Sequence, residues 1–328
     1  MANKLLNVKN LKVSFKSGKQ KLTAVEQVEF SLDKGQIIGI VGESGCGKSV
    51  TATSILRLVS PEISEIDKAS EILFEGVDLT KLTEKQMRKI RGKEISMIFQ
   101  EPMSSLNPVY KIGDQMVEMI KAHNPSISKK EAEAKSIEML KAVGIPSPEQ
   151  RIHEYPHQMS GGMRQRVMVA MALLCNPKLL IADEPTTALD VTIQAQILRL
   201  IKKMTKERET SVILITHDMG VVAEMADNVM VMYAGQVVES GTLEEIFDHP
   251  THPYTKGLLK SIPKLGETSE ENLYTIDGTV PSLDEMPKGC RFSTRCQYAE
   301  ERCMKEVCQM YGNSSHKVRC FQFAKEVI

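Results

Sequence analysis

The chain has 328 residues, with 42 lysines and arginines against 42 aspartates and glutamates, and 41% hydrophobic residues. This composition excludes a disordered chain, and the length suits one large domain or two modest ones. The longest apolar run, from Val167 to Cys175, is far shorter than the roughly 20 residues of a membrane-spanning helix. The neutral net charge argues against non-specific nucleic-acid binding, and the first residues lack a secretory signal. We therefore expect a soluble cytoplasmic protein.

The order of predicted elements favours an α/β fold. Segments 5–16 and 24–32 alternate apolar and polar residues, as half-buried strands do. Further strands are predicted at 36–41, 71–75, 95–99, 178–182, 211–216 and 229–239. Helices are predicted at 48–59, 112–122, 128–143 and 161–175, with two more that begin at Asp190 and Met219. This alternation indicates a mostly parallel sheet that helices cover. Residues 101–170 look like a helical insertion, and the pattern ends near residue 250, so the predicted domains are 1–250 and 251–328.

A glycine-rich turn at residues 42–49 predicts a phosphate-binding loop. The run from Gly42 to Ser49 fits G-x-x-x-x-G-K-[ST], after a predicted strand and before a predicted helix. Glycines let backbone N–H groups surround phosphate oxygens, and the N-terminus of the helix adds the positive end of its dipole. Lys48 is expected to reach the β- and γ-phosphates, and the Ser49 hydroxyl to bind Mg²⁺. Cys46, inside the loop, is interpreted as a small residue rather than a nucleophile.

Acidic residues end the apolar strand at 179–182. Asp183 and Glu184 then stand where strand ends of an open α/β sheet face a ligand. We expect Asp183 to hold Mg²⁺ through water and Glu184 to orient or deprotonate an attacking water. His217 follows the next strand, where it either contacts the γ-phosphate or is a structural loop histidine. The catalytic candidates are thus Lys48, Glu184 and His217.

The segment from Tyr155 to Arg166, together with the two motifs above, resembles the signature of ATP-binding-cassette (ABC) ATPases. Met159 and Met163 replace the first and last residues of the family pattern Leu-Ser-Gly-Gly-Gln, and the Ser-Gly-Gly core is intact. The resemblance implies a P-loop NTPase core with an antiparallel β subdomain and a helical subdomain. It also implies that two such subunits close head-to-tail, so that each Ser-Gly-Gly contacts ATP bound by the partner.

The resemblance assigns roles to residues of this sequence. Those implied to bind ATP are Phe15, Gly42, Glu43, Ser44, Gly45, Cys46, Gly47, Lys48, Ser49, Val50 and Gln100. Those implied to hold Mg²⁺ are Ser49, Gln100 and Asp183, and those implied to act on the partner's ATP are Ser160, Gly161 and Gly162. Asp190 ends the segment that crosses the dimer interface, and His217 is the switch histidine. Phe15 either stacks on adenine or belongs to the core.

Three longer segments are similar to ATP-binding subunits of dipeptide and oligopeptide importers. They are 100–108, 184–196 and 249–256, and the residues around Cys290 and Cys296 extend the likeness. Such a subunit pairs with a second ATPase, itself or a paralogue, on the cytoplasmic face of the membrane. It energises two permease subunits, and an extracytoplasmic peptide-binding protein delivers the cargo. Met103 to Pro108 is then either the permease contact or a surface turn. Nickel importers share much of this pattern, so a metal cargo stays an alternative. An ATPase acting on nucleic acid is a weaker alternative, because the sequence has one cassette, zero net charge and no heptad run.

The C-terminal cysteines are candidate metal ligands. Five of the seven cysteines follow residue 289, with the spacing Cys290-x5-Cys296-x6-Cys303-x4-Cys308-x11-Cys320. The tight C-x2-C pairs of structural zinc sites are absent, and wider spacing suits thiolates around an iron–sulfur cluster. The importer resemblance implies a small Cys-rich C-terminal domain with a [4Fe-4S] cluster on Cys290, Cys296, Cys303 and Cys320. Cys308 is the spare, and zinc or mere packing are the alternatives.

Overall fold

The computed structural model describes residues 4–18, 20–100, 105–186, 190–262, 274–313 and 315–323. The chain divides into two compact units, each built from segments that are distant in sequence. The first unit comprises residues 1–32, 37–80 and 215–328, and the second comprises 33–36 and 81–214. The α/β class predicted from the element order is confirmed, and each unit is described below by itself.

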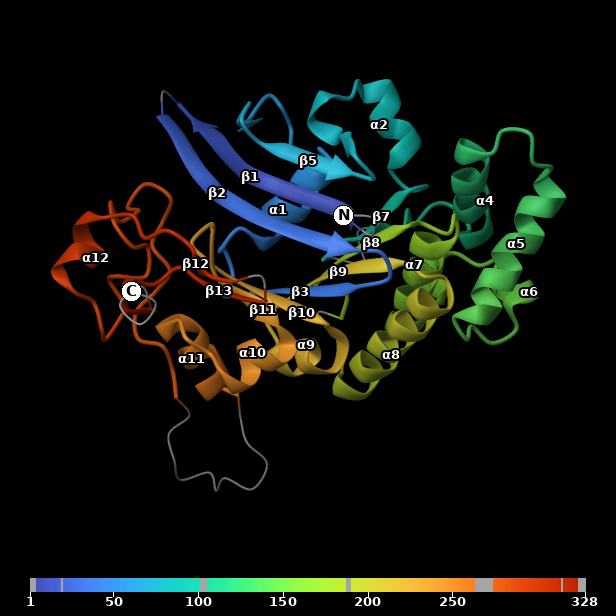
Figure 1. Cartoon of the computed structure of the whole chain (residues 1–328). Helices are drawn as coiled ribbons and strands as arrows, with labels where there is room; N and C mark the ends of the chain where they lie inside the picture. Colours follow the sequence, from blue (N-terminus) through green and yellow to red (C-terminus); the bar gives the residue numbers. More distant parts are fainter. Residues whose placement is uncertain are drawn as a thin grey trace. The chain divides into compact units, whose positions relative to one another are not determined.

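An antiparallel sheet forms the first part of unit one. It contains β1 (Lys4–Ser17), β2 (Gln20–Asp33), β4 (Ser64–Ile66), β5 (Glu71–Phe74) and β6 (Val77–Asp78), in the order β2-β1-β5-β6 with β4 also on β1. In Figure 1 the long strands β1 and β2 lie side by side. The alternation that predicted these strands reflects burial, because Leu6, Val8 and Val13 are covered while Lys9 is exposed.

The second sheet of unit one carries the phosphate loop. Its strands follow the order β12 (Tyr311–Gly312), β13 (His316–Val318), β11 (Gln236–Thr242), β10 (Asn228–Tyr233) and β3 (Ile37–Val41). Strand β10 is parallel to β3, and β11 turns back antiparallel to β10. The helices of this unit are α1 (Lys48–Ile55), α9 (Met219–Met225), α10 (Leu243–Asp248), α11 (Pro253–Lys260) and α12 (Glu301–Lys305). All residues of β3 are buried, which explains why its sequence is a continuous apolar run.

A separate Cys-rich C-terminal domain is not shown. The described part of the C-terminal region instead belongs to unit one, where β13 pairs with β11. The fully buried Glu239 carboxylate accepts hydrogen bonds from the backbone N–H groups of Thr251 (2.7 Å) and His252 (3.0 Å) and lies 2.7 Å from Nε2 of His316. A buried carboxylate needs such partners, so these contacts tie the C-terminal residues to the sheet.

Burial of His252 predicts a pH-dependent stability. Burial, aided by the charges of Arg319 and Lys256, lowers the pKa of His252 to about 3, and its Nδ1 accepts the N–H of Tyr254 at 3.1 Å. Between pH 6.5 and 3 the imidazole of His252 binds a proton in the unfolded chain but not in the folded chain. The contribution of His252 to the free energy of unfolding is therefore complete above pH 6.5 and is lost as the pH falls. A His252→Asn variant keeps a neutral acceptor. Its unfolding free energy should fall about 2 kcal/mol less than wild type from pH 7 to pH 5, measured by urea titration. Equal losses in both proteins would contradict this.

The second unit combines a parallel sheet with most of the helices. Its strands lie in the order β9 (Ser211–Thr216), β8 (Leu179–Asp183) and β7 (Ile95–Ile98), and β7 is parallel to β8. The last two residues of β9 already belong to unit one. The helices are α2 (Glu84–Ile90), α4 (Ile112–His123), α5 (Lys129–Ala142), α6 (Pro148–Arg151), α7 (Gly161–Leu173) and α8 (Val191–Glu207), with 3₁₀ turns at Pro156–Gln158 and, entering this unit, at Leu79–Lys81. In Figure 1, α4, α5 and α6 form a group within this unit.

The predicted elements match the observed ones closely, with informative exceptions. The helix predicted at 128–143 begins with a capping box, in which Ser128 and Glu131 form reciprocal hydrogen bonds of 3.2 and 3.0 Å. The helix predicted at 48–59 ends at Ile55, because Arg57 adopts a left-handed backbone with φ of 51°. Helix α2 was not predicted, although Thr83 and Gln86 form a capping box there too. None of the described helices is both long and apolar enough to span a membrane.

Candidate functional site

The phosphate loop joins β3 to α1 in unit one. Gly42 has φ of 152°, and a Cβ there would lie 2.2 Å from the carbonyl oxygen of Met232, so only glycine fits. Gly45 and Gly47 also have positive φ values, of 78° and 95°, which side chains rarely adopt. Gly47 immediately precedes α1, whose first N–H groups have no partner within the helix. The loop therefore has the backbone of an anion site at the start of a helix.

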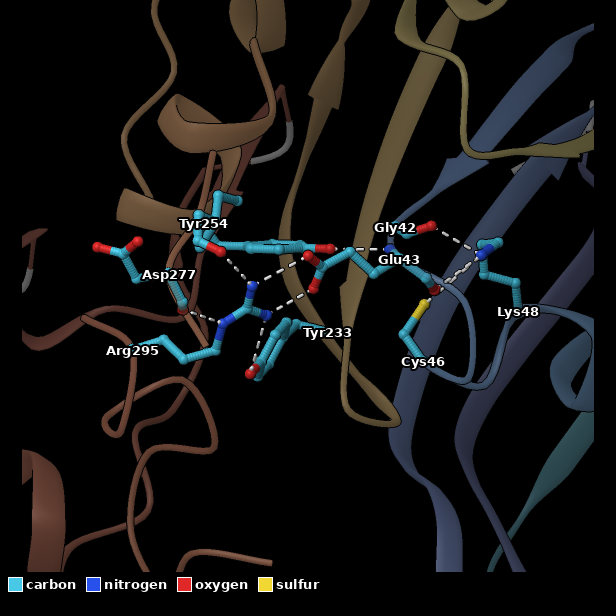
Figure 2. Close-up of polar contacts among 9 residues, drawn as sticks. Gly42, Glu43, Cys46, Lys48, Tyr233, Tyr254, Asp277 and Arg295 are labelled. Carbon is cyan, nitrogen blue, oxygen red and sulfur yellow. Dashed lines mark hydrogen bonds and ion pairs between the residues drawn. The ribbon is translucent and has the colours of Figure 1, made fainter. Parts of the chain in front are cut away.

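Lys48 is the buried cation of this loop. Its side chain extends along the loop, as Figure 2 shows, and its Nζ donates to the carbonyl oxygens of Gly42 (2.7 Å) and Glu43 (3.0 Å). The ammonium is therefore held by carbonyl groups of the loop itself. Cys46 is fully buried, and burial raises the pKa of its thiol, which suits a small packing residue rather than a nucleophile.

The acidic pair lies at the end of β8 in unit two. Asp183 is buried, 3% exposed, and Glu184 follows it with a φ of 46°, in the left-handed region. This backbone conformation is strained for a glutamate. Such strain persists only where the surrounding structure enforces it, and strained residues cluster at functional sites. Oε2 of Glu184 accepts a hydrogen bond of 3.0 Å from Nε2 of Gln100, which comes after β7. Two predicted site residues that are 84 positions apart are thus in contact.

The signature residues begin α7. Ser160 is its N-cap and accepts the N–H of Met163 at 3.3 Å. Gly161 is exposed, with open space where a Cβ would be, whereas a Cβ on Gly162 would lie 3.3 Å from Ile193. Asp190 caps α8 by accepting the N–H of Ile193 at 3.0 Å. The N-terminus of α7, a helix of 13 residues, is therefore open to an anion.

The remaining predicted site residues have the following positions. Phe15 is half-buried in β1, opposite Ser64 of β4, and His217 is exposed after β9. Ser49 and Val50 lie in the first turn of α1. Residues 101–104 and 187–189 lie outside the described residues, so Met103 and the residues just before Asp190 in the predicted interface segment are not placed.

Sequence reasoning missed two residues that hold the phosphate loop. Arg295 forms a two-pronged ion pair with the carboxylate of Glu43, and Oη of Tyr254 accepts the backbone N–H of Glu43 (Figure 2). More than 200 positions separate each residue from Glu43 in the sequence. Both residues lie in segments that resemble importer ATPases. That resemblance alone did not predict that either residue contacts Glu43.

The predicted iron–sulfur ligands have no support from a metal-binding arrangement among the described residues. Among the described residues, no three His, Cys, Asp or Glu side chains come close enough together to hold a metal ion. Cysteine spacing does not determine how far apart the thiols lie in an irregular segment. Burial raises the pKa of Cys290 to about 11, and the neighbouring thiols of Cys303, Cys296 and Cys320 also raise it.

The cassette-like fold, phosphate loop and signature helix define the class of protein as an ABC-type ATPase. Residues 25–187 match the family "ABC transporter", and residues 238–303 match "Oligopeptide/dipeptide transporter, C-terminal region". The dimeric structure of the ATP-binding cassette MJ0796, in a post-hydrolysis state with ADP and Pi, matches with a TM-score of 0.64 at 28% identity. The match covers 73% of this chain and 98% of that one.

Similarity to curated proteins extends beyond the ATPase domain. The chain is 57% identical over 296 residues to the oligopeptide transport ATP-binding protein OppD of Bacillus subtilis, covering 90% of this chain and 82% of that protein. It is 54% identical to OppD of Haemophilus influenzae, covering 92% of each chain. The dipeptide transport ATP-binding protein DppD of B. subtilis is 52% identical, covering 97% and 94%. The chain belongs to this family of peptide-transport ATP-binding proteins, and it is an ATPase.

Proposed function

We propose that this chain hydrolyses ATP to drive the import of oligopeptides or dipeptides through an ABC transporter. The observation that carries the proposal is the extent of the similarity. It covers the ATPase core and also the C-terminal region, residues 238–303, which matches the family "Oligopeptide/dipeptide transporter, C-terminal region". Relatives above 50% identity are named for transport of these two classes of peptide.

In this proposal the phosphate loop binds the triphosphate of ATP. Backbone N–H groups of residues 42–49 and the start of α1 accept the phosphate charge, and Lys48 adds a cation at the β- and γ-phosphates. Phe15 stacks on the adenine. Mg²⁺, which prefers oxygen ligands, would be held by Ser49, Gln100 and Asp183, where it would neutralise phosphate charge.

Glu184 is the proposed general base. Its carboxylate orients a water for in-line attack on the γ-phosphorus; an oxygen–phosphorus bond forms, the bond to the β-phosphate oxygen breaks, and the water's proton passes to Glu184. The hydrogen bond from Nε2 of Gln100 fixes the carboxylate oxygen Oε2 of Glu184. His217 is proposed to contact the γ-phosphate.

The proposed partners follow from the exposed signature. Ser160, Gly161 and Gly162 would contact ATP held by a second ATPase, a paralogue or another copy, with Asp190 at the same interface. Closure of the pair would act on two permease subunits, which keep this chain at the cytoplasmic face of the membrane. A peptide-binding protein would supply the cargo. Residues 1–250 would form the ATPase domain, with the helical subdomain at 101–170, and 251–328 the transporter-type extension.

Peptide uptake tests this function. A strain that lacks the chain should import a labelled tripeptide only when wild-type protein is restored, and not when Glu184→Gln protein is restored at equal abundance. Nickel uptake should be the same in all three strains. Peptide uptake that does not depend on the chain, with nickel uptake that does, would overturn the proposal in favour of the metal-importer alternative.

We further propose that Cys290, Cys296, Cys303 and Cys320 hold a [4Fe-4S] cluster. The support is that burial raises the pKa of Cys290, and the nearby Cys303, Cys296 and Cys320 thiols raise it further, so these four thiols interact electrostatically. Anaerobically purified protein should contain about four irons and four sulfides per chain. Both should be lost in Cys290→Ser but kept in Cys175→Ser. Zinc alone, or no metal, would contradict the cluster.

A further inference from the structure

Glu43 places a negative charge inside the loop that binds an anion. It follows Gly42 directly, and its carbonyl oxygen accepts the hydrogen bond from Nζ of Lys48. Its side chain is 32% exposed, so its charge is only partly screened by water. A carboxylate near phosphate oxygens opposes their binding through like-charge repulsion. Some feature of the chain must therefore offset this charge.

Arg295 supplies that offset. Its Nη1 and Nη2 lie 2.6 and 3.0 Å from the two carboxylate oxygens of Glu43, and its side chain is 3% exposed. Such bidentate pairs are strong and orient both groups. The guanidinium does not depend on Glu43 for its position. Its Nε donates to the Asp277 carbonyl at 2.8 Å and its Nη2 to the Ile276 carbonyl at 3.0 Å, and it lies over the ring of Tyr233 (Figure 2).

Tyr254 holds the backbone of the same loop residue. Its Oη accepts the N–H of Glu43 at 2.9 Å, and burial raises the pKa of the phenol, which therefore stays neutral. The fully buried Tyr254 ring packs against Tyr233 and Phe292, at centroid distances of 4.8 and 5.4 Å. Glu43 is thus fixed at its N–H by one C-terminal residue and at its carboxylate by another.

A second arginine, Arg291, lies close to Arg295 in the sequence and supports the phosphate loop at another point. Arg291 is buried and contacts the carbonyl oxygen of Ala234 and the carboxylate of Glu26. The next residue, Gly235, donates its N–H to the carbonyl oxygen of Cys46 at 2.9 Å. Residues 291–295 therefore reach the phosphate loop directly at Glu43 and indirectly at Cys46.

We propose that Arg295 is a positioning residue for ATP binding: it neutralises Glu43 and, with Tyr254, holds the phosphate loop in its anion-binding form. The C-terminal region thereby takes part in nucleotide binding by the same chain. Loss of the Arg295 charge leaves Glu43 unpaired beside the phosphates. The cost rises with ligand charge, so it is larger for ATP than for ADP.

Equilibrium nucleotide binding to the full-length chain tests this. Arg295→Gln should raise the Kd for MgATP about tenfold, which corresponds to one removed charge interaction of about 1.4 kcal/mol, and the Kd for ADP by less. The double variant E43Q/R295Q, which has no unpaired charge, should return to within about threefold of wild type. Arg302→Gln is the matched control, because Arg302 is in the same region but contacts Glu300 and Phe321 instead.

Either of two results with the Arg295 variants would overturn the proposal. One is an Arg295→Gln protein that binds ATP within twofold of wild type. The other is a double variant that binds as weakly as Arg295→Gln while both melt at the wild-type temperature, since a purely structural role predicts no rescue. Glu43→Gln alone keeps the test decisive should Arg295→Gln fail to fold. It should bind ATP at least as tightly as wild type, and a loss above about threefold would contradict the electrostatic account.

Discussion

Replacing Glu184 with glutamine should lower ATP turnover at least about 100-fold while ATP still binds. Glutamine has nearly the same shape, and its carbonyl oxygen can accept the hydrogen bond that Nε2 of Gln100 donates to Glu184. The amide cannot take a proton from the attacking water, so the chemical step loses its base. Steady-state phosphate release and equilibrium ATP binding, measured on the same preparation, separate the two effects.

The control for this variant is Glu207→Gln. Glu207 is an exposed carboxylate at the end of α8 and forms only a 3.9 Å surface pair with Lys203. Its loss should leave turnover unchanged, since such pairs contribute little. Undiminished hydrolysis in the Glu184 variant would exclude Glu184 as the base, and loss of ATP binding would assign it a structural role instead.

Gly235→Ala should destabilise the chain by about 3 kcal/mol or more. Gly235 has φ of 82°, and a Cβ there would lie 2.2 Å from the backbone carbonyl oxygen of Ala24 and 2.9 Å from the guanidinium of Arg291. The Ala24 backbone on one side and the buried Arg291 side chain on the other leave no cheap relaxation. Because the Gly235 N–H donates to Cys46, the shift should also weaken ATP binding. Urea unfolding and nucleotide titration measure the two consequences.

Gly76 offers a matched comparison for this substitution. It has the same φ of 82°, but nothing lies within 4 Å of a Cβ built there. Gly76→Ala therefore carries the backbone strain without the clash, and we expect a loss of only about 1 kcal/mol with unchanged ATP binding. Equal losses at the two positions would mean that strain, rather than contact with Ala24, sets the cost at Gly235.

The local sequence predicted most helices and strands, because an element that buries one face has apolar residues at a regular spacing. The run 36–41 and its glycine-rich turn appear as β3 and the phosphate loop, and the capping box at Ser128 begins α5. Helix α2 was missed because its seven residues bury only Met87, so little apolar period marks it. The contact between Gln100 and Glu184 needed the parallel pairing of β7 and β8, which no local signal gives.

The C-terminal region shows where sequence reasoning ends. The importer resemblance implied a small Cys-rich domain and the cysteine spacing suggested a cluster, whereas the structure shows β13 in the sheet beside β11 and no described group of side chains arranged to hold a metal. The contact of Arg295 with Glu43 joins residues 252 positions apart. An ion pair between residues so far apart leaves no repeating pattern in the sequence. Only the folded structure shows which residues are paired.

ATP hydrolysis by the assembled transporter in lipid nanodiscs tests the central claim most directly. The rate would be measured with the binding protein empty, loaded with peptide, or replaced by nickel ions or RNA. Peptide-loaded binding protein should stimulate hydrolysis several-fold, and Glu184→Gln in this chain should remove the stimulation. Stimulation by nickel or RNA, with none by peptide, would contradict a peptide-import ATPase.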